Sequence, residues 1–590
     1  MEENFTPEVI RQEVAASTAF IKCRRVYCVV TNEGYPMFSS PWNALLPEDN
    51  RCGNHAVQNI RSVGDGNALF LEAIHRQGKE AYAVFKPYEM GGGRSVAHGA
   101  PIAPYAMGTE DVGGTQTGYG AFLSEHPEYA VARFPYDAQN ENAPITCIEL
   151  EYLLDAVSQR CGPFSREEIA RQEDGLANAE MEFAIYVSND NGVYTRLQQT
   201  PLVEKSVCRK SVQGMDGFAL GDGPIRVLNV CLRGLNISQK YVAVVLERGP
   251  SLPIIPQTMA RLFCAQGEVP STATAYVRES LCPEDETHTW GNEGNPHVAQ
   301  SAKDIKDFQR AGFEFDWHGS GFWGDGWLRT PVICLGRGKR KALRGTPCEG
   351  YEQVRAYWLS FIEKLLDMGY DGIDLRLQNH SGMVSDWTQY GWNEPIRQRY
   401  QEMFGKALDP AAYDPMDILR VRGSYYLDFV REARALIHSR GKKLQLHLRE
   451  AWEHPSCSHE FNQMAFWAMP KVLPDWQEAV DLADEITLKD YHFNHYNPMF
   501  SQGVKQRCAQ QNKPVWIHLY MEQGKEMNEA FLRAVSEDAG VSGILLYEMT
   551  HSVLGATTLS DTLGLVCVHG GVVSSQTPMA DAFRRLEHLL

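Results

Sequence analysis

Residues 372–377 alternate strictly between apolar and polar side chains. Asp374 and Arg376 fall on one face of this segment, and three aliphatic residues fall on the other. A period of two predicts a β-strand with a single apolar face. Because a helical pattern over 354–368 precedes it and further helical stretches follow, we expect one strand of a β/α barrel. Its apolar side would meet the helices, and its charged side would point into the barrel.

Other segments repeat this combination of a strand-like run and a neighbouring helical pattern. Helical patterns over 417–440 and 526–539 each precede one of them, and Gly441 stands at the C-cap position of the first helix. Eight strands connected in this way predict an α/β fold, a closed (β/α)8 TIM-type barrel. The seven further strand candidates are residues 25–30, 81–88, 331–335, 443–450, 484–491, 514–520 and 543–548.

The pattern changes after residue 145, where short alternating runs follow one another without long helices between them. Turn-forming clusters such as 188–192 separate these runs. We therefore predict an inserted β-rich, sandwich-like domain. The expected division is residues 1–144 for the first part of the barrel, 145–258 for the insertion, and 259–590 for the remainder of the barrel with the active-site strands.

Composition excludes some classes of function. The formal net charge is −18, so a nucleic-acid partner is not expected. The one basic run, residues 337–341, is interpreted as a solvated or substrate-side loop. No apolar stretch approaches the roughly 18 residues that a membrane span requires. A homo-oligomer is neither required nor excluded.

The start of the sequence has no basic region followed by an apolar region, so no signal peptide is visible. The 14 cysteines are scattered without a Cys-x-x-Cys pair, which favours reduced thiols. We therefore expect a cytoplasmic protein as the sequence is written, or an exported one if a signal has been removed.

Polar and charged side chains stand at the carboxyl ends of the predicted strands, where barrel enzymes keep their catalytic residues. Tryptophans are frequent nearby, and aromatic faces beside carboxylates suit sugar rings. The expected partner is therefore a carbohydrate. The candidate catalytic carboxylates are Asp374, Glu450 and Glu548, and the candidate substrate-binding residues are Arg376, Asn379, His380, His447, Arg449, Lys489, Asp490, Tyr491, His518 and Tyr520.

A set of short motifs adds a family resemblance, which covers residues 310–560 well and the first 140 loosely. The motifs are Gly-Phe-Glu-Phe-Asp-Trp at 312–317, Gly-Phe-Trp-Gly-Asp-Gly-Trp at 321–327, Asp-Gly-Ile-Asp-Leu-Arg at 371–376, Asn-His-Ser at 379–381, Asn-Glu-Pro at 393–395 and Leu-Tyr-Glu at 546–548. With them the chain resembles the glycosyl-hydrolase-10-like barrel family, in particular its uncharacterised bacterial branch with an inserted β domain.

The resemblance implies a β/α barrel that acts on glycosidic bonds. The family tends to place an aspartate two residues after the position of Asp374, where this chain has Arg376. A catalytic carboxylate is therefore not carried over to that position.

The leading hypothesis is a glycoside hydrolase, which needs one protonated carboxyl as general acid and one ionised carboxylate as nucleophile or base. We assign Glu450 and Glu548 to this pair without deciding which is which. Asp374 would hold a sugar hydroxyl or orient a catalytic partner. This mechanism needs no cofactor and no metal.

Charge on the predicted inner face suggests the kind of sugar. Arg376, Arg449 and Lys489 outnumber the inward carboxylate Asp374, which favours an anionic glycan such as a uronic or sulfated one. Two alternatives remain. One is a non-catalytic glycan-binding barrel, which is favoured by the presence of Arg376 where the family tends to have an aspartate. The other is a metal-dependent sugar isomerase or lyase with ligands among His447, Asp490, His518 and Glu548.

Overall fold

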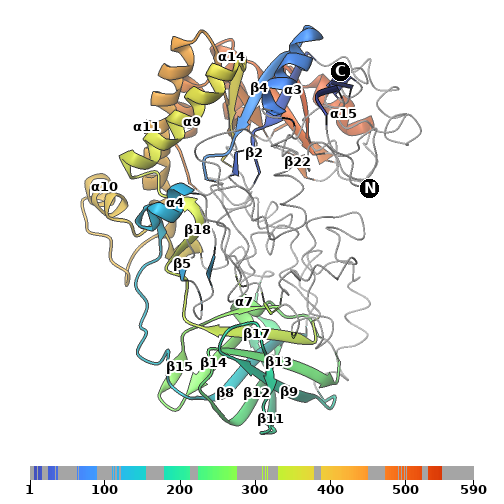
Figure 1. The fold of residues 1–590 in the computed structure, drawn as a ribbon, viewed down its shortest axis with the longest axis vertical. Coiled ribbons are helices and arrows are strands. Elements are labelled where there is room, and N and C mark those ends of the chain that lie inside the picture. Colours follow the sequence, from blue (N-terminus) through green and yellow to red (C-terminus); the bar gives the residue numbers. More distant parts are fainter. Residues whose placement is uncertain are drawn as a thin grey trace.

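The fold was analysed in a computed structural model. The described residues are 6–8, 11–12, 14–15, 24–32, 35–36, 63, 66–88, 109–110, 112, 116–117, 121–154, 178–212, 223–250, 252–275, 309, 312–313, 315, 330–377, 387–448, 472–488, 491–492, 495–496, 498–499, 501–520 and 529–547. They form a parallel sheet covered by helices and, at the other end of the molecule, a pair of antiparallel sheets (Figure 1).

The parallel sheet contains seven strands that follow one another in sequence order. Every neighbouring pair is parallel. Seven of the eight predicted strands are thereby confirmed. They are β1 (Arg25–Val29), β4 (Glu80–Phe85), β19 (Gly372–Leu375), β20 (Lys443–Leu448), β21 (Glu485–Leu488), β24 (Val515–Tyr520) and β25 (Gly543–Tyr547).

This sheet is strongly curled. In sheet order β1 and β21 are four strand spacings apart, which would be roughly 19 Å in a flat sheet. Yet the guanidinium of Arg25 in β1 donates to the carboxylate of Glu485 in β21 at 2.6 Å. Tyr27 of β1 also shares an apolar cluster with Leu545 of β25, the strand at the opposite edge. The sheet therefore has a concave inner face on which side chains from distant strands meet.

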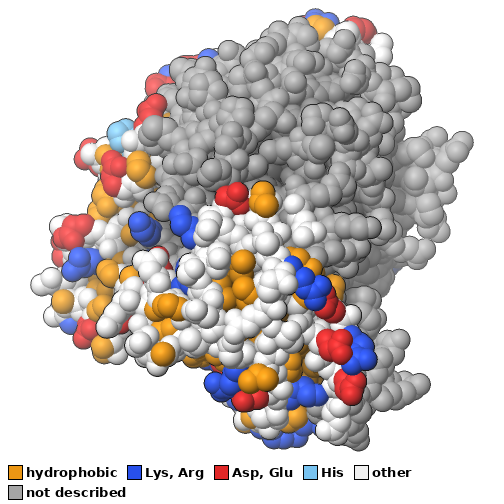
Figure 2. Space-filling view, turned by 60° about the horizontal axis from the view of Figure 1, so that its bottom comes forward, with side chains coloured by type: hydrophobic (Ala, Val, Ile, Leu, Met, Phe, Trp, Pro, Cys, Tyr) orange, Lys and Arg blue, Asp and Glu red, His pale blue; other side chains and the backbone are white. Residues whose placement is uncertain are grey.

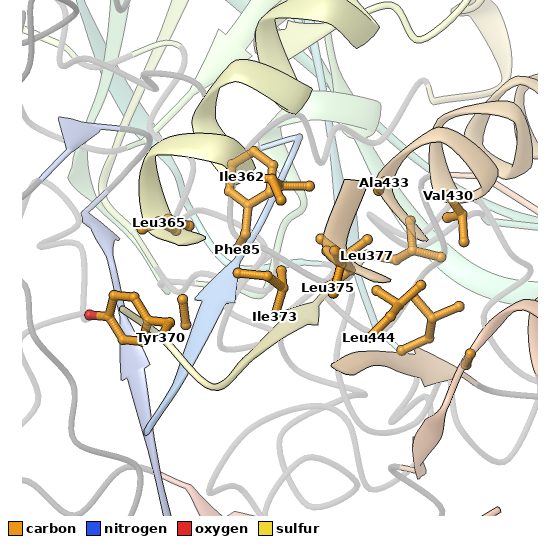
Figure 3. Close-up of a cluster of buried hydrophobic side chains, with 14 of the residues drawn as sticks. Phe85, Ile362, Leu365, Tyr370, Ile373, Leu375, Leu377, Val430, Ala433 and Leu444 are labelled. Atoms are coloured by element: carbon orange, nitrogen blue, oxygen red, sulfur yellow. The ribbon is translucent and has the colours of Figure 1, made fainter. Parts of the chain in front are cut away.

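Helices pack on the convex outer face of the sheet (Figure 1). The outward residues of the strands, such as Ile373 and Leu375, pack against the apolar faces of α9 and α11 (Figure 3). Phe85 stacks on Phe361 with ring centroids 5.0 Å apart. The covering helices are α3 (Gly66–Arg76), α9 (Glu352–Met368), α11 (Pro415–Ser439), α13 (Trp476–Leu482), α14 (Gln502–Gln510) and α15 (Glu529–Glu537).

Local sequence signals explain where these helices begin and end. Asp414 precedes α11 and its side chain accepts a hydrogen bond from the backbone N–H of Met416, with Pro415 at the first helical position. Gly369 ends α9 with φ at 103°, a conformation that a residue with a side chain rarely adopts. The predicted helices over 354–368, 417–440 and 526–539 correspond to α9, α11 and α15.

The predicted third barrel strand, residues 331–335, is wrong. Strand β4 pairs directly with β1 and with β19, so no strand lies between them. Residues 332–337 instead form β17 (Val332–Arg337), which is antiparallel to β13 (Tyr241–Arg248) and β16 (Ser271–Thr274). β17 is buried on both faces. A strand buried in this way gives a continuous apolar run in either kind of sheet, so the pattern alone did not separate the two.

Two five-stranded antiparallel sheets form the sandwich-like region. One apolar core contains inward residues of both sheets, including Leu228, Val230, Val244 and Leu335. The strands of these sheets continue beyond residue 258, as far as Arg337. The first sheet has the order β10 (Thr195–Arg196), β9 (Glu182–Ser188), β13, β17, β16, and the second has the order β11 (Leu202–Lys210), β12 (Ile225–Ile237), β8 (Ile145–Leu153), β14 (Ala260–Cys264), β15 (Gly267–Val269).

Figure 2 shows the sandwich end from outside, and its described surface mixes acidic and basic side chains. The interpretation of residues 337–341 as a solvated loop is wrong for Arg337, which is buried. Its guanidinium has five donors, and it satisfies backbone carbonyls at one end of the sandwich. Burial lowers the pKa of Arg337. The carbonyls belong to Ile237, Gln239, Glu141 and Ala143, all at 2.7–2.8 Å.

A small layer between the two regions contains α10 (Glu394–Phe404) and the antiparallel pair of β7 (Ala130–Ala132) and β18 (Ala342–Pro347) (Figure 1). Asn393 bonds the backbone of Ala130 and Ala132 at 2.8 Å, so this part of the Asn-Glu-Pro motif anchors a strand. No helix among the described residues combines the length and the apolar character that crossing a membrane requires.

Candidate active site

Alternate residues of the parallel strands share the inner face, where they form successive polar layers. The layer at the amino ends centres on Arg25 and Glu485. Arg25 donates to both oxygens of Glu485, at 2.6 and 3.1 Å, and to Glu80 at 2.9 and 3.0 Å. Trp516 and Tyr82 donate to Glu485 at 2.8 and 3.2 Å. Gln445 and Lys443 of β20 complete the contacts, so the two charges are held in a network of side chains from five strands.

This amino-end layer has the electrostatics of a structural ion pair. Burial by itself raises the pKa of Glu485, but the hydrogen bonds and charge of Arg25 hold that pKa below its ordinary value. The Arg25 guanidinium also lies over the ring of Tyr82, 3.7 Å from its centroid. Because chemistry in β/α barrels is found at the carboxyl ends of the strands, we interpret this layer as stabilising.

Two glycines make room for the aromatic rings of this layer, and each lies on the strand next to the ring that it accommodates. A Cβ on Gly372 would come within 2.4 Å of the Tyr82 ring, and a Cβ on Gly543 would come within 2.7 Å of the Trp516 ring. A side chain at either position would therefore displace a ring from the interior. Above this layer Tyr27 donates to Gln445, which donates to Thr487.

The layer nearer the carboxyl ends contains the predicted Asp374, Arg376 and His447. Asp374 is fully buried. Arg376 Nε donates to Asp374 Oδ2 at 3.0 Å, and His447 Nε2 lies 3.0 Å from each of the two carboxylate oxygens. The three side chains come from two adjacent strands, as the alternation predicts.

The charge state of Asp374 follows from these two partners. Burial alone raises the pKa of a carboxyl, but His447 and Arg376 together hold the pKa of Asp374 below its ordinary value. At neutral pH Asp374 is therefore an ionised, acceptor-only group. A carboxyl in this state does not serve as a general acid.

His518 of β24 joins the same layer. Its ring packs edge-to-face on the ring of His447, with centroids 5.4 Å apart and planes at 84°. The side chain of His518 is buried. Four of the predicted site residues are thus brought together on one inner face: Asp374, Arg376, His447 and His518.

Two further predicted site residues belong to described strands. Tyr520 ends β24 and Tyr491 begins β22 (Tyr491–His492), and both are placed by their backbone. The rest of the predicted site residues lie outside the described residues: Glu450, Glu548, Asn379, His380, Arg449, Lys489 and Asp490.

Sequence reasoning missed Arg25 and Glu485. Glu485 stands two residues before the inward Thr487, so the alternation already placed it on the inner face. Its pairing shows that Asp374 is not the one inward carboxylate. Arg376 is neutralised by Asp374, which removes one of the three cations that favoured an anionic ligand. Among the described residues, no three His, Cys, Asp or Glu side chains gather closely enough to hold a metal ion.

No family model matches the chain. No match was found among curated proteins. Among solved structures, a β-galactosidase from Marinomonas ef1 is similar over 42% of this chain and 45% of its own, with 10% identity and a TM-score of 0.27. The PgaB (BpsB) glycoside hydrolase domain from Bordetella bronchiseptica is similar over 41% of this chain and 64% of its own, with 12% identity and a TM-score of 0.25.

A third neighbour is catalytic domain 2 of an Ostrinia furnacalis group II chitinase, similar over 29% of this chain and 40% of its own, with 12% identity and a TM-score of 0.16. The chain thus matches less than two thirds of the length of each of these structures. All three are glycoside hydrolases. At TM-scores this low the likeness assigns no activity, so a function must be argued from the residues.

Proposed function

We propose that this chain is a glycoside hydrolase that cleaves poly- or oligosaccharides at the carboxyl ends of a closed (β/α)8 barrel. The observation that supports it most is the meeting of Asp374, Arg376, His447 and His518 on one curled inner face. Polar side chains from three strands then stand where a barrel enzyme needs them. An eighth strand would have to fit between β25 and β1, because every other neighbour in the sheet is already paired.

The catalytic pair in this proposal is Glu450 and Glu548. Glu450 stands two residues after the end of β20, and Glu548 directly follows the end of β25. Because β20 and β25 are parallel strands of one sheet, their carboxyl ends, which these two glutamates follow in the sequence, lie at the same end of the sheet, the end toward which His447 lies. Asp374 is ionised and buried, so the general acid is assigned to this pair and not to Asp374.

The test is turnover of a panel of neutral, uronic and sulfated oligosaccharides by the purified protein. Glu450→Gln and Glu548→Gln should each lower the rate on the active glycan by more than ~100-fold. Glu268→Gln is the matched control, because Glu268 is an exposed carboxylate in β15 of the sandwich. Near-normal rates in both site variants would remove the assignment.

The same panel decides the substrate class and the alternatives. Turnover of charged glycans in preference to neutral ones would support the anionic substrate. Activity that disappears with a chelator and returns with a divalent metal would favour the metal-dependent alternative. Binding without turnover of any glycan would favour the non-catalytic barrel. Proton NMR of the first product formed would show whether the anomeric configuration is retained or inverted.

A further inference from the structure

Asp374 is completely enclosed, with no exposed surface. A side chain in this position does not touch a substrate, so any effect on the reaction must pass through its neighbours. Those neighbours are Arg376 on the same strand and His447 on the next strand, each 3.0 Å away. The proposed function gives the site a substrate but leaves the task of Asp374 open.

Arg376 fixes the charge of Asp374. A guanidinium keeps its proton at any pH of interest, and its Nε donates directly to the carboxylate. With Asp374 ionised, both of its oxygens are acceptors. The ring nitrogen that faces them, Nε2 of His447, must then be the donor and must carry a proton.

The consequence for His447 is a single tautomer. A neutral imidazole carries one proton, and Asp374 holds it at Nε2. The lone pair then lies at Nδ1, on the other side of the ring. His518 packs edge-to-face on this ring and restrains its plane. Among the described residues, Tyr27 of β1 and Tyr426 of α11 also lie close to the carboxylate: burial raises the pKa of their hydroxyls, and the charge of Asp374 raises it further.

We propose that Asp374 is a positioning residue, which fixes His447 in the Nε2–H tautomer so that Nδ1 accepts a hydrogen bond from a substrate hydroxyl. This inference rests on the proposed function for its substrate, a glycan, and on the geometry for its tautomer. It gives His447 a substrate-binding role through one defined atom. It also explains how an arginine two residues after Asp374 fits an active site: the arginine keeps the aspartate ionised.

The tautomer can be measured without any substrate. We would label the full-length protein with ¹⁵N-histidine and record long-range ¹H–¹⁵N correlations of the imidazoles, with His447→Gln to assign the signal of His447. In the wild-type protein we expect the Nε2–H form to exceed the Nδ1–H form by about tenfold or more, because a hydrogen bond to a charged group is strong. A predominantly Nδ1–H ring in the wild type would overturn the proposal, and so would an imidazolium with protons on both nitrogens at neutral pH, because neither form has a lone pair at Nδ1.

Asp374→Asn should reduce this preference, because an amide can present either a donor or an acceptor to the ring. Asp374→Glu should restore part of it. The matched control is Asp371→Asn, three residues earlier, where the carboxylate is half-exposed and pairs with Lys442 at 3.2 Å. If Asp374→Asn does not fold, the wild-type spectrum still decides the proposal.

Kinetics on the active glycan of the panel tests whether Asp374 acts through His447. His447→Gln should raise KM by about tenfold, because one hydrogen bond to the bound sugar is lost. Asp374→Asn should raise KM in the same direction, and the double variant should be no worse than His447→Gln alone. Additive losses would show that Asp374 acts independently of His447 and would overturn the proposal.

The two proposals fail in different ways. If the wild type turns over no glycan, the proposed function fails, while the tautomer still shows whether Asp374 positions His447. If turnover is found and His447 is not in the Nε2–H form, the positioning role fails and the glycoside hydrolase stands.

Discussion

The two charged layers on the inner face of the parallel sheet are built from the same kinds of residues but differ in how they are closed. At the amino ends, Arg25 and Glu485 take all of their contacts from side chains of the strands themselves. At the carboxyl ends, Asp374 is equally buried, but its partners Arg376 and His447 stand at or just past the strand ends, where the chain leaves the sheet. The first arrangement suits stability, and the second suits contact with a ligand.

The largest expected effect breaks the amino-end layer. Glu485→Gln leaves Arg25 without its bidentate partner in a buried site, and we expect the free energy of unfolding to fall by about 3 kcal/mol or more. Urea unfolding followed by circular dichroism measures this. Glu268→Gln serves again as the exposed control. A loss below ~1 kcal/mol would show that the layer is not a main source of stability.

A smaller effect is expected from filling the space beside the same layer. Gly372→Ala would place a methyl group against the Tyr82 ring, and overpacking of this kind costs about 1–3 kcal/mol. Gly223→Ala is the control, because a Cβ there meets no atom within 4 Å. Equal unfolding midpoints for the two variants would contradict the packing argument.

The two layers also predict how stability depends on pH. Glu485 and Asp374 both have pKa values below their ordinary ones in the folded protein. The unfolded chain has the ordinary values of about 4.3 and 3.9. The stabilisation is therefore complete above this range and is lost as the pH falls through the lower, folded-state pKa values.

The expected slope is up to about 1.4 kcal/mol per pH unit for each group. Urea unfolding at a series of acidic pH values measures it. Glu485→Gln should flatten the curve, because the variant has one group fewer to protonate. An unchanged slope in this variant would indicate that Glu485 is not ionised in the folded protein.

The smallest expected effect on stability falls at the carboxyl-end layer. His447→Gln leaves the Asp374–Arg376 pair in place, so the free energy of unfolding should change by less than ~1 kcal/mol. The same variant should impair sugar binding, whereas folded Glu485→Gln should keep its KM. If His447→Gln were as destabilising as Glu485→Gln, the functional contrast between the layers would disappear.

Much of this fold could be predicted from the sequence because apolar and polar residues alternate along several of its strands. The clearest case is 372–377, whose inward Asp374 and Arg376 were assigned to the correct face. The failure at 331–335 has a physical reason: residues 332–335 of β17 are all apolar, because its two faces pack into two different apolar clusters, so the segment lacks the polar face that marks an inward strand such as 372–377. The sheet to which β17 belongs is determined by its pairing with β13 and β16, and the sequence of one segment does not specify its pairing partners.

Within the candidate site, the sequence predicted which residues share a face but not which residues pair. Glu485 was overlooked although its spacing from Thr487 marks it as inward. Its partner Arg25 is far away in the sequence, at the start of another strand. The roles of Glu450 and Glu548 stay predictions, since they depend on side chains beyond the described strand ends.

The direct pairing of β4 with β19 has a consequence for how the chain is made. The whole antiparallel pair of sheets lies between these two strands in the sequence, so about 290 residues must leave the ribosome after β4 before it can pair with its second neighbour, β19. At roughly 5–20 residues per second this takes on the order of 15 to 60 s. During that time the edge of β4 that will pair with β19 keeps its backbone N–H and C=O groups unpaired, which makes the nascent chain prone to aggregation.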